Sequence, residues 1–174
     1  MGVGKSTVAG IISELTGFPV VDVDKVGHEV LKSHAEDIAK EFGSDLVVNG
    51  NVDRKRLGKI VFSDAEKLKK LESILHPEMV EIVRERVGRF KDAVVDCALL
   101  ERMKLVDICD VIITVVSDLK TAAERKKIPA EDMKRIWDLQ EDIRPIGTVV
   151  ENRGDIQDLK KRVESIISRY RKRS

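Results

Sequence analysis

The sequence predicts an α/β fold in which helices cover both faces of a mostly parallel sheet. The main observation is alternation: short β-branched runs are separated by amphipathic stretches whose apolar residues recur at helical spacing. The strand-like runs are also nearly continuous in apolar residues, as strands buried on both faces are. With 174 residues, the chain has the length of one compact domain, and we expect a single domain over 1–174.

Each element follows from the same patterns. We expect helices over 5–16, 25–42, 53–61, 65–75, 77–90, 119–125, 131–141 and 156–172. We expect strands over 18–24, 93–97, 111–116 and 148–150, with a turn region over 43–52. The helices 65–75 and 77–90 are separated at His76-Pro77, because proline favours the first turn of a new helix.

Two segments are expected to have roles of their own. The largely helical region 26–90 is the candidate for binding a phosphate acceptor. The polar stretch 125–147 has the weakest apolar periodicity and is predicted to form a short, mobile lid.

Composition excludes several classes of function. The formal net charge is +1, so bulk electrostatics give no reason to expect nucleic acid or a membrane as partner. No apolar run approaches the roughly 20 residues of a membrane-spanning helix, and the N-terminus lacks a signal-peptide pattern. The two cysteines, Cys97 and Cys109, lie in apolar runs and are expected to be buried and reduced. We expect a cytoplasmic protein that is a monomer or a weak oligomer.

The strongest motif is Gly2-Val3-Gly4-Lys5-Ser6-Thr7, the second half of the phosphate-loop pattern Gly-x-x-x-x-Gly-Lys-Ser/Thr. Gly4 would let the backbone approach phosphate oxygens, and successive N–H groups at the start of a helix would bind the anion. Lys5 would contact the β- and γ-phosphates, and the Ser6 hydroxyl would ligate Mg²⁺. The motif predicts ATP and Mg²⁺ as cofactors and a three-layer P-loop NTPase fold.

The pattern normally opens with a further glycine that follows a hydrophobic strand. In such folds this strand lies at the centre of the sheet, so a chain without it would expose two strand edges. We therefore expect Met1 to be an internal methionine of a longer protein, or the chain to be truncated. Extension upstream should reveal an apolar strand and a glycine.

Several further segments follow one another in a recognisable order. They are Val21-Asp22-Val23-Asp24 with His28, Phe42-Gly43 with Asn49–Phe62, Leu71–Pro77, Asp96–Glu101, and Arg125 with Gln140 and Asn152-Arg153-Gly154. Over most of its length the chain thereby resembles the dephospho-coenzyme A kinase family. The resemblance implies ATP-dependent phosphorylation of the ribose 3′-hydroxyl of 3′-dephospho-coenzyme A, a small-molecule substrate, to give coenzyme A and ADP.

Three positions depart from the family's pattern. Ala98 replaces a proline, Thr121 stands where a second arginine is usual, and Gly147 stands where an aspartate is usual. Two other functions therefore remain open. One is a P-loop kinase for another small metabolite or nucleotide, and the other is a nucleotide-binding paralogue without catalysis.

The predicted catalytic residues are Lys5, Asp24 and Arg125. Asp24 is expected to orient the acceptor hydroxyl, because a carboxylate at the C-terminal end of a strand faces the crevice of the sheet. It could instead cap the helix that starts at Lys25, and Asp22 lies on the same side of the predicted strand. Arg125 would reach the transferred phosphate, whereas Arg135 is expected to be a surface arginine.

The remaining candidates bind nucleotide, metal or acceptor. Asp96 either holds a Mg²⁺-bound water together with Ser6 or caps a following helix, and the sequence favours neither. By the resemblance, Asn152 and Gly154 border the adenine, with a plain turn as the alternative. The predicted acceptor-binding residues are Asp24, His28, Arg54, His76 and Leu99. Of these, Arg54 could equally form a local ion pair, and His76 could simply start a helix before Pro77.

Overall fold

The structure is a computed structural model that describes residues 2–139, 144–153 and 155–171. The chain divides into two compact units, one formed by Met1–Val21 with Val87–Ser174 and the other by Asp22–Arg86. Helices and strands alternate along the chain, and the predicted α/β class is confirmed. The division of the chain into one domain with an acceptor region and a lid stays a prediction.

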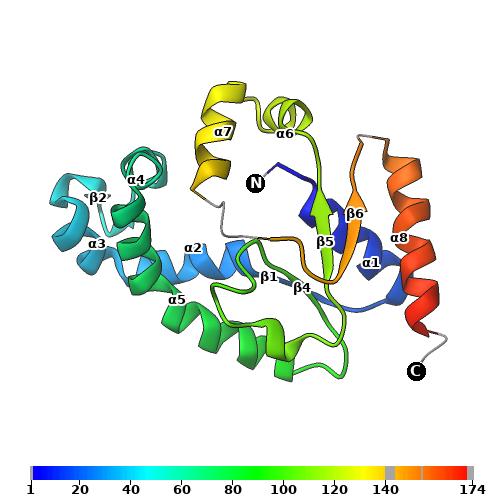
Figure 1. The fold of residues 1–174 in the computed structure, drawn as a ribbon. Coiled ribbons are helices and arrows are strands. Elements are labelled where there is room, and N and C mark those ends of the chain that lie inside the picture. The colour runs from blue at the N-terminus through cyan, green and yellow to red at the C-terminus, as the bar shows by residue number, and fades with distance from the viewer. Residues whose placement is uncertain (1, 140–143, 154, 172–174) are drawn as a thin grey trace. The chain divides into compact units, whose positions relative to one another are not determined.

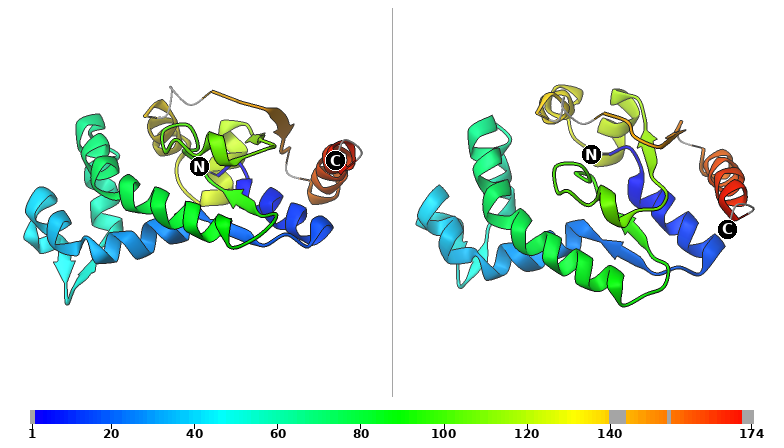
Figure 2. Two further views of the ribbon diagram at one scale, coloured as in Figure 1. Left: turned by 90° about the horizontal axis from the view of Figure 1, so that it is seen from below. Right: turned by 60° about the horizontal axis from the view of Figure 1, so that its bottom comes forward.

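The first unit contains the parallel strands and the helices that pack on them (Figure 1). Strand β5 (Ile113–Val116) pairs in parallel with β6 (Thr148–Glu151), with Ile113 opposite Thr148 and Val116 opposite Glu151. Helix α1 (Lys5–Thr16) contacts β5, β4 (Val94–Asp96) and helix α8 (Ile156–Arg171). Both views of Figure 2 show α8 beside α1.

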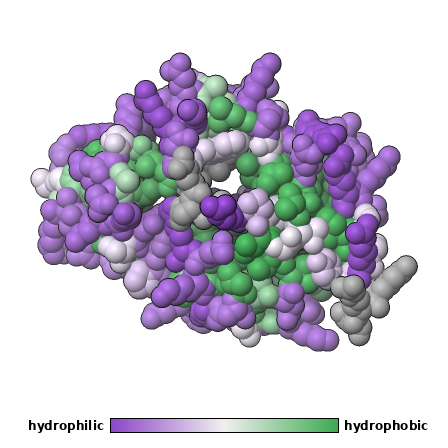
Figure 3. Space-filling model, in the orientation of Figure 1, coloured by the Kyte–Doolittle hydropathy of each residue, from purple (hydrophilic) through white to green (hydrophobic). Residues whose placement is uncertain are grey.

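A single apolar cluster joins these elements. Val8 and Ile11 of α1 are buried against Val150 of β6 and against Leu159 and Val163 of α8. The spacing of the apolar residues in α1 and α8 places them on one face of each helix, so burial of that face stabilises both. On the face drawn in Figure 3, apolar surface gathers where Figure 1 draws β5.

The strands of the first unit do not join into one continuous sheet among the described residues. Strand β1 (Val20–Asp22) pairs with β4, and β5 pairs with β6, as two separate two-stranded sheets. The Val94 N–H donates to the Pro19 carbonyl oxygen at 2.8 Å beside the first pair. Within the described chain, β4 and β5 are therefore each paired on one side only. An apolar strand upstream of Met1 stays a prediction.

Two short helices of the first unit form a separate small core. Helix α6 (Leu119–Lys126) packs on α7 (Ala130–Asp138), and Ala122, Ala123 and Met133 are buried between them. The side chain of Asp118 caps α6 by accepting from the Thr121 N–H at 2.8 Å. Hydrogen bonding from Thr121 lowers the pKa of Asp118, so this cap is ionised at neutral pH. A short 3₁₀ turn, η2 (Val106–Ile108), precedes β5.

The second unit is largely helical. Its elements are α2 (Val23–Ser33), α3 (Ala35–Phe42), η1 (Ser44–Leu46), β2 (Val47–Val48), β3 (Asn51–Val52), α4 (Arg54–Val61) and α5 (Ala65–Gly88). Strands β2 and β3 form an antiparallel hairpin whose Asn49-Gly50 turn has positive φ at both residues, as such tight turns require. The core of this unit is apolar, and Val26, Val30, Ile38, Leu57 and Val83 are among its most buried residues.

The structure corrects two predicted helix boundaries of the second unit. The predicted helix over 25–42 is two helices that meet at His34, whose backbone (φ −94°, ψ 19°) leaves the helical region. The predicted helices 65–75 and 77–90 are one helix, α5, with Pro77 inside it. Leu75, Met79 and Val83 of α5 are buried at four-residue spacing on one face, and we infer that this burial outweighs the hydrogen bond that Pro77 cannot donate.

None of the helices that the structure describes is both long and apolar enough to cross a bilayer.

Candidate active site

The phosphate loop (Gly2–Thr7) leads into helix α1, and the N-terminal end of this helix has no side-chain cap. Gly4 is the residue before the helix and has a left-handed backbone (φ 93°, ψ 22°), and no side chain caps the first turn. The first turn also contains no acidic residue. The backbone N–H groups at the start of α1 therefore have no capping side-chain oxygen and no acidic residue within their own turn, an arrangement that favours binding of an anion.

Lys5 and Asp96 are brought together from positions far apart in the sequence. The Lys5 Nζ donates to Asp96 Oδ1, and the Asp96 side chain is only 3% exposed, whereas that of Lys5 is 25% exposed. Asp96 is the last residue of β4, and the chain from 97 to 105 forms turns. The alternative in which Asp96 caps a following helix is therefore wrong. A buried carboxylate at a strand end, paired with the phosphate-loop lysine, is what the structure shows instead.

Asn152 links the phosphate loop to helix α6. It follows β6, is 5% exposed, and its Nδ2 donates to the Val3 carbonyl oxygen at 2.9 Å. Its Oδ1 accepts from Arg125 Nη2 at 2.9 Å. Arg125 Nη1 also lies 3.3 Å from the Val3 carbonyl oxygen and 3.4 Å from that of Gly2. Three predicted site residues, Val3, Arg125 and Asn152, thus meet in one hydrogen-bonded cluster.

Ser117, which was not among the predicted site residues, belongs to the same cluster. Its Oγ donates to the Asn152 carbonyl oxygen at 3.0 Å and lies 3.4 Å from Arg125 Nη1. Ser117 comes directly after β5, and a polar residue at the C-terminal end of a parallel strand is the signal that could have identified it. Within the predicted lid, the Leu139 carbonyl oxygen accepts a hydrogen bond from Arg102 Nη2 at 3.0 Å.

Asp22 and Asp24 have different positions from those predicted. Strand β1 ends at Asp22, whose side chain caps α2 by accepting from the Lys25 N–H at 3.1 Å. Asp24 lies inside the first turn of α2 and is exposed. Two parts of the prediction are therefore wrong: Asp24 is not the helix cap, and the two carboxylates do not share a strand face. We infer that the helix begins as early as Val23 because Val23 and Val26 are both buried on one face of α2.

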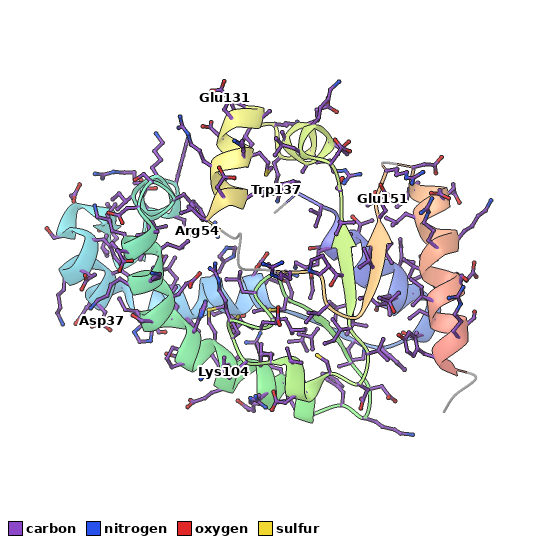
Figure 4. The ribbon with its side chains drawn as sticks, viewed as in Figure 1. Asp37, Arg54, Lys104, Glu131, Trp137 and Glu151 are labelled. Carbon is purple, nitrogen blue, oxygen red and sulfur yellow. The ribbon has the colours of Figure 1, made fainter. Side chains whose placement is uncertain are left out.

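The other predicted acceptor residues are distributed over both units. His28 is exposed on α2, one helical turn after Asp24. Arg54 is exposed in the first turn of α4, which is capped by Asp53 (Figure 4). His76 is half-buried within α5, so its assignment as a helix-start residue is wrong. Leu99 is half-buried in the turns after β4 in the first unit.

The local ion pair considered for Arg54 belongs to another arginine of the same helix. Arg56 Nη2 pairs with Asp45, and Arg56 Nη1 donates to the Asp45 carbonyl oxygen at 2.9 Å. The Asp53 carboxylate accepts from the N–H groups of Lys55 and Arg56 at 3.1 and 3.0 Å. Arg54 therefore lies exposed in the first turn of α4. Its neighbours make the local contacts: Asp53 caps the helix, and Arg56 pairs with Asp45.

The lid residues lie partly within the described chain. Arg135 of α7 pairs with Asp132 at 3.7 Å on the surface, as an ordinary surface arginine does. Trp137 lies toward the end of α7 and packs on its core with α6 (Figure 4). Gln140 and Gly154, the glutamine and the turn glycine of the resemblance, lie outside the described residues.

One of the three departures from the family pattern, Gly147, has a structural account. Gly147 precedes β6 with a left-handed backbone (φ 69°), and a Cβ there would come within 2.2 Å of the Ile112 carbonyl oxygen. Thr121 lies in the first turn of α6, beside the Asp118 cap. Ala98 is exposed in the turn after Asp96, and nothing in the structure explains the loss of the proline.

Comparisons with known proteins agree on one family. The sequence profile of the dephospho-CoA kinase family matches residues 1–158. The dephospho-CoA kinase of Fusobacterium nucleatum is 38% identical over 92% of this chain and 90% of its own length. That of Aquifex aeolicus is 32% identical over 95% of this chain and 91% of its own length.

Solved structures give the same answer for the fold. The crystal structure of TT1252 from Thermus thermophilus is similar with a TM-score of 0.75 and 26% identity, covering 97% of this chain and 93% of that one. The dephospho-CoA kinase from Campylobacter jejuni, at 24% identity, shares the fold with a TM-score of 0.63 over 97% of this chain and 92% of that one. On the family profile and the sequence relatives together, this chain belongs to the dephospho-CoA kinase family.

Proposed function

We propose that this kinase transfers the γ-phosphoryl group of ATP to the ribose 3′-hydroxyl of 3′-dephospho-coenzyme A, giving coenzyme A and ADP. The observation that carries the proposal is the start of α1, which has no side-chain cap, no acidic residue in its first turn and Lys5 as its first residue. It occurs in a chain of the dephospho-CoA kinase family. In the reaction, a bond forms between the hydroxyl oxygen and the γ-phosphorus. The bond from the γ-phosphorus to the β,γ-bridging oxygen breaks, and that oxygen leaves with ADP.

The first unit supplies the groups for the triphosphate. The N–H groups at the start of α1 would hold phosphate oxygens, and Lys5 would place its charge on the β- and γ-phosphates. To do so, Lys5 shares its ammonium between phosphate and Asp96. Arg125 would stabilise charge on the transferred group.

The oxygen ligands that Mg²⁺ prefers are present at the same end of the first unit. Ser6 has an exposed hydroxyl in the first turn of α1, and Asp96 has a buried carboxylate at the end of β4. These residues fit a Mg²⁺ ion that is held mainly by phosphates and water, and the ion would neutralise phosphate charge when bound. Ser6 would ligate it directly, and Asp96 would hold one of its waters.

The second unit would supply the acceptor side. The Asp24 carboxylate would accept the proton of the attacking hydroxyl, since it is exposed and is not used as the helix cap. His28 on the same face of α2 would contact the acceptor, as would His76. Arg54 would bind acidic groups of the acceptor substrate. Leu99 of the first unit is proposed to pack on the acceptor.

The remaining parts of the proposal concern the surroundings of the site. Residues 125–147 would act as the lid, and Asn152 and Gly154 would lie near the nucleotide. We propose that the protein works in the cytoplasm as a monomer or weak oligomer, on small molecules and on neither nucleic acid nor membrane. The near-neutral net charge supports this, as does the absence of a disulfide at Cys97 and Cys109 within the described residues.

The decisive experiment measures ADP release with ATP and Mg²⁺, with and without 3′-dephospho-coenzyme A. Acceptor-dependent release is expected, with the phosphate found on the ribose 3′-oxygen of the product. Nucleoside monophosphates and other small metabolites serve as control acceptors. A higher kcat/KM for one of them would support the other kinase function. ATP binding without any acceptor-dependent release would contradict the proposal and favour a non-catalytic paralogue.

A further inference from the structure

We propose that Asn152 is a positioning residue for the phosphate loop: its side-chain amide fixes the loop at Val3 and holds Arg125 beside it, rather than contacting the adenine. This inference rests on the proposed nucleotide-binding function of the loop. It assigns Asn152 and Ser117 to the triphosphate end of the site.

Both ends of the Asn152 amide are engaged by the protein itself. Nδ2 donates to the Val3 carbonyl oxygen and Oδ1 accepts from Arg125 Nη2, both at 2.9 Å. The side chain is almost fully buried. A nucleobase that took over either contact would leave the Val3 carbonyl oxygen or the Arg125 guanidinium without this partner.

The backbone of Asn152 is fixed as firmly as its side chain. Its N–H donates to the Val116 carbonyl oxygen at 2.8 Å, which extends the ladder between β5 and β6 by one residue. Its carbonyl oxygen accepts from Ser117 Oγ at 3.0 Å. Because strand pairing and the Ser117 hydroxyl hold the main chain, the side-chain amide has a fixed position from which to set the loop.

The loop fits against this amide so closely that only glycine is possible at one position. A Cβ on Gly4 would lie 2.1 Å from Asn152 Nδ2, far inside van der Waals contact. The glycine that precedes α1 is therefore in contact with the same side chain that binds Val3. Movement of Asn152 would change both the start of the helix and the direction of its N–H groups.

Arg125 connects the same cluster to helix α6. Its guanidinium contacts Asn152 Oδ1, and its Nη1 lies 3.3 Å from the Val3 carbonyl oxygen and 3.4 Å from Ser117 Oγ. Asn152 thus determines where Arg125 stands relative to the loop. We infer that the phosphate loop and Arg125 keep fixed positions relative to each other and bind a triphosphate together.

The test compares ligands that share the triphosphate but differ in the base. Dissociation constants of ATP and of inorganic tripolyphosphate, both with Mg²⁺, are measured by calorimetry for the full chain and for Asn152→Ala. We expect the variant to weaken both ligands by the same factor, about tenfold or more. If it weakens ATP but leaves tripolyphosphate unchanged, Asn152 is an adenine contact and the proposal is wrong.

Arg125 and Ser117 give two further tests of the same cluster. In a double-mutant cycle with Arg125→Ala, the two substitutions should be strongly non-additive, because each already breaks the shared contact. Additive effects would contradict the proposal. Ser117→Ala should weaken both ligands in the same direction but less, and Ser117→Thr, which keeps the hydroxyl, should restore binding. Equal loss in the alanine and threonine variants would argue against it.

The controls separate positioning from general damage to β6. Thr148, at the other end of β6, has its Oγ1 3.1 Å from the Tyr170 hydroxyl, and Thr148→Val should leave both dissociation constants unchanged. A loss of binding in that variant equal to the loss in Asn152→Ala would overturn the proposal. If Asn152→Ala does not fold, the Ser117 pair decides the question.

The outcome is independent of the acceptor chemistry. Binding of ATP and tripolyphosphate is measured without acceptor, so a chain that binds both but phosphorylates nothing would refute the proposed function and not this inference. An unaltered chain that binds neither ligand would overturn this inference.

Discussion

The two units present their predicted site residues in opposite ways. In the first unit, the phosphate loop is held by contacts within the protein: Lys5 pairs with buried Asp96, and Asn152 joins Val3 to Arg125. In the second unit, Asp24, His28 and Arg54 are exposed on the starts and faces of helices. The predicted nucleotide-binding residues are thus held in place by the fold itself, whereas these three predicted acceptor residues are exposed, and only His76 and Leu99 among the acceptor residues are half-buried.

This difference determines how substitutions should act. Where a site residue is also a partner of a buried group, its removal changes stability and activity together. Where it is exposed and its helix is capped by a neighbour, activity can be lost while stability is kept.

The largest effect is expected at Lys5. Lys5→Ala should lower the acceptor-dependent kcat by about 10³-fold or more, because a charge on the transferred phosphate is lost. It should also lower the free energy of unfolding by about 3 kcal/mol, because Asp96 is left buried and unpaired. The measurements are ADP release and urea unfolding.

The matched control is the double variant Lys5→Ala/Asp96→Asn. It should recover most of the lost stability, because the buried charge is gone, yet remain inactive. Recovered activity in this variant would show that Lys5 only balances the charge of Asp96.

Asp24 should behave in the opposite way. Asp24→Ala is expected to lower kcat by about 10²-fold, as loss of a group that accepts a proton does, and to change the free energy of unfolding by no more than about 0.5 kcal/mol. Asp22→Ala, two residues away, removes the helix cap and should cost about 1 kcal/mol. Loss of stability without loss of rate in the Asp24 variant would contradict the assignment.

A smaller effect is expected at two glycines, Gly4 before helix α1 and Gly10 within it. Gly4→Ala should weaken ATP at least about tenfold, since a left-handed alanine costs about 1–2 kcal/mol and its Cβ meets Asn152. Gly10→Ala, on α1 with open space around its Cβ, should stabilise the protein by up to about 1 kcal/mol and leave ATP binding unchanged. Calorimetry and thermal unfolding measure the two effects, and equal ATP affinity in both variants would sink the prediction.

The smallest effect is a pH dependence within the second unit. His34 Nδ1 lies 2.9 Å from Asp37 Oδ2, and Nε2 lies 2.8 Å from Glu78 Oε2. Hydrogen bonding to Asp37 raises the pKa of His34 above its usual 6.5, Glu78 adds to this, and burial opposes it. Lys40 lies 3.9 Å from the same Asp37, and Ser33 Oγ lies 3.4 Å from Glu78, so these groups surround the cluster.

The sign follows from the raised pKa. The folded protein binds the proton more tightly than the unfolded chain, so the contribution of His34 is complete below about pH 6.5 and is lost as the pH rises through its folded pKa. His34→Gln should therefore cost at most about 1 kcal/mol at low pH and progressively less at higher pH. Urea unfolding over that range measures the difference, and a cost that does not change with pH would contradict the prediction.

The sequence predicted the elements whose signals are local. Helix α1 begins and ends as expected, at Lys5 and Thr16, because its apolar spacing and its flanking glycines are all in the chain itself. Pro77 misled the prediction, because a proline signal is local whereas the burial of Leu75, Met79 and Val83 that keeps α5 whole is tertiary. The break at His34 was missed for the same reason, since no glycine or proline marks it.

The candidate site shows the same division. The phosphate loop, Asp96 and Arg125 could be named from motif and resemblance. Two contacts could not be predicted: the pairing of Asp96 with Lys5 and the hydrogen bond from Ser117 to Asn152. Both contacts join segments that are distant in the chain. Asp22 and Asp24 were both placed on one strand, whereas a strand-to-helix boundary falls between them.

Gly147 has a consequence for how this chain can change over evolution. A Cβ at this position would meet the Ile112 main-chain carbonyl at 2.2 Å, so no side-chain adjustment can make room for it. The aspartate that the family resemblance would place there cannot be introduced by a single substitution without moving the backbone. A side chain at this position would need a compensating change in the path of the backbone before β6, so any substitution of Gly147 has to be coupled to a second substitution elsewhere.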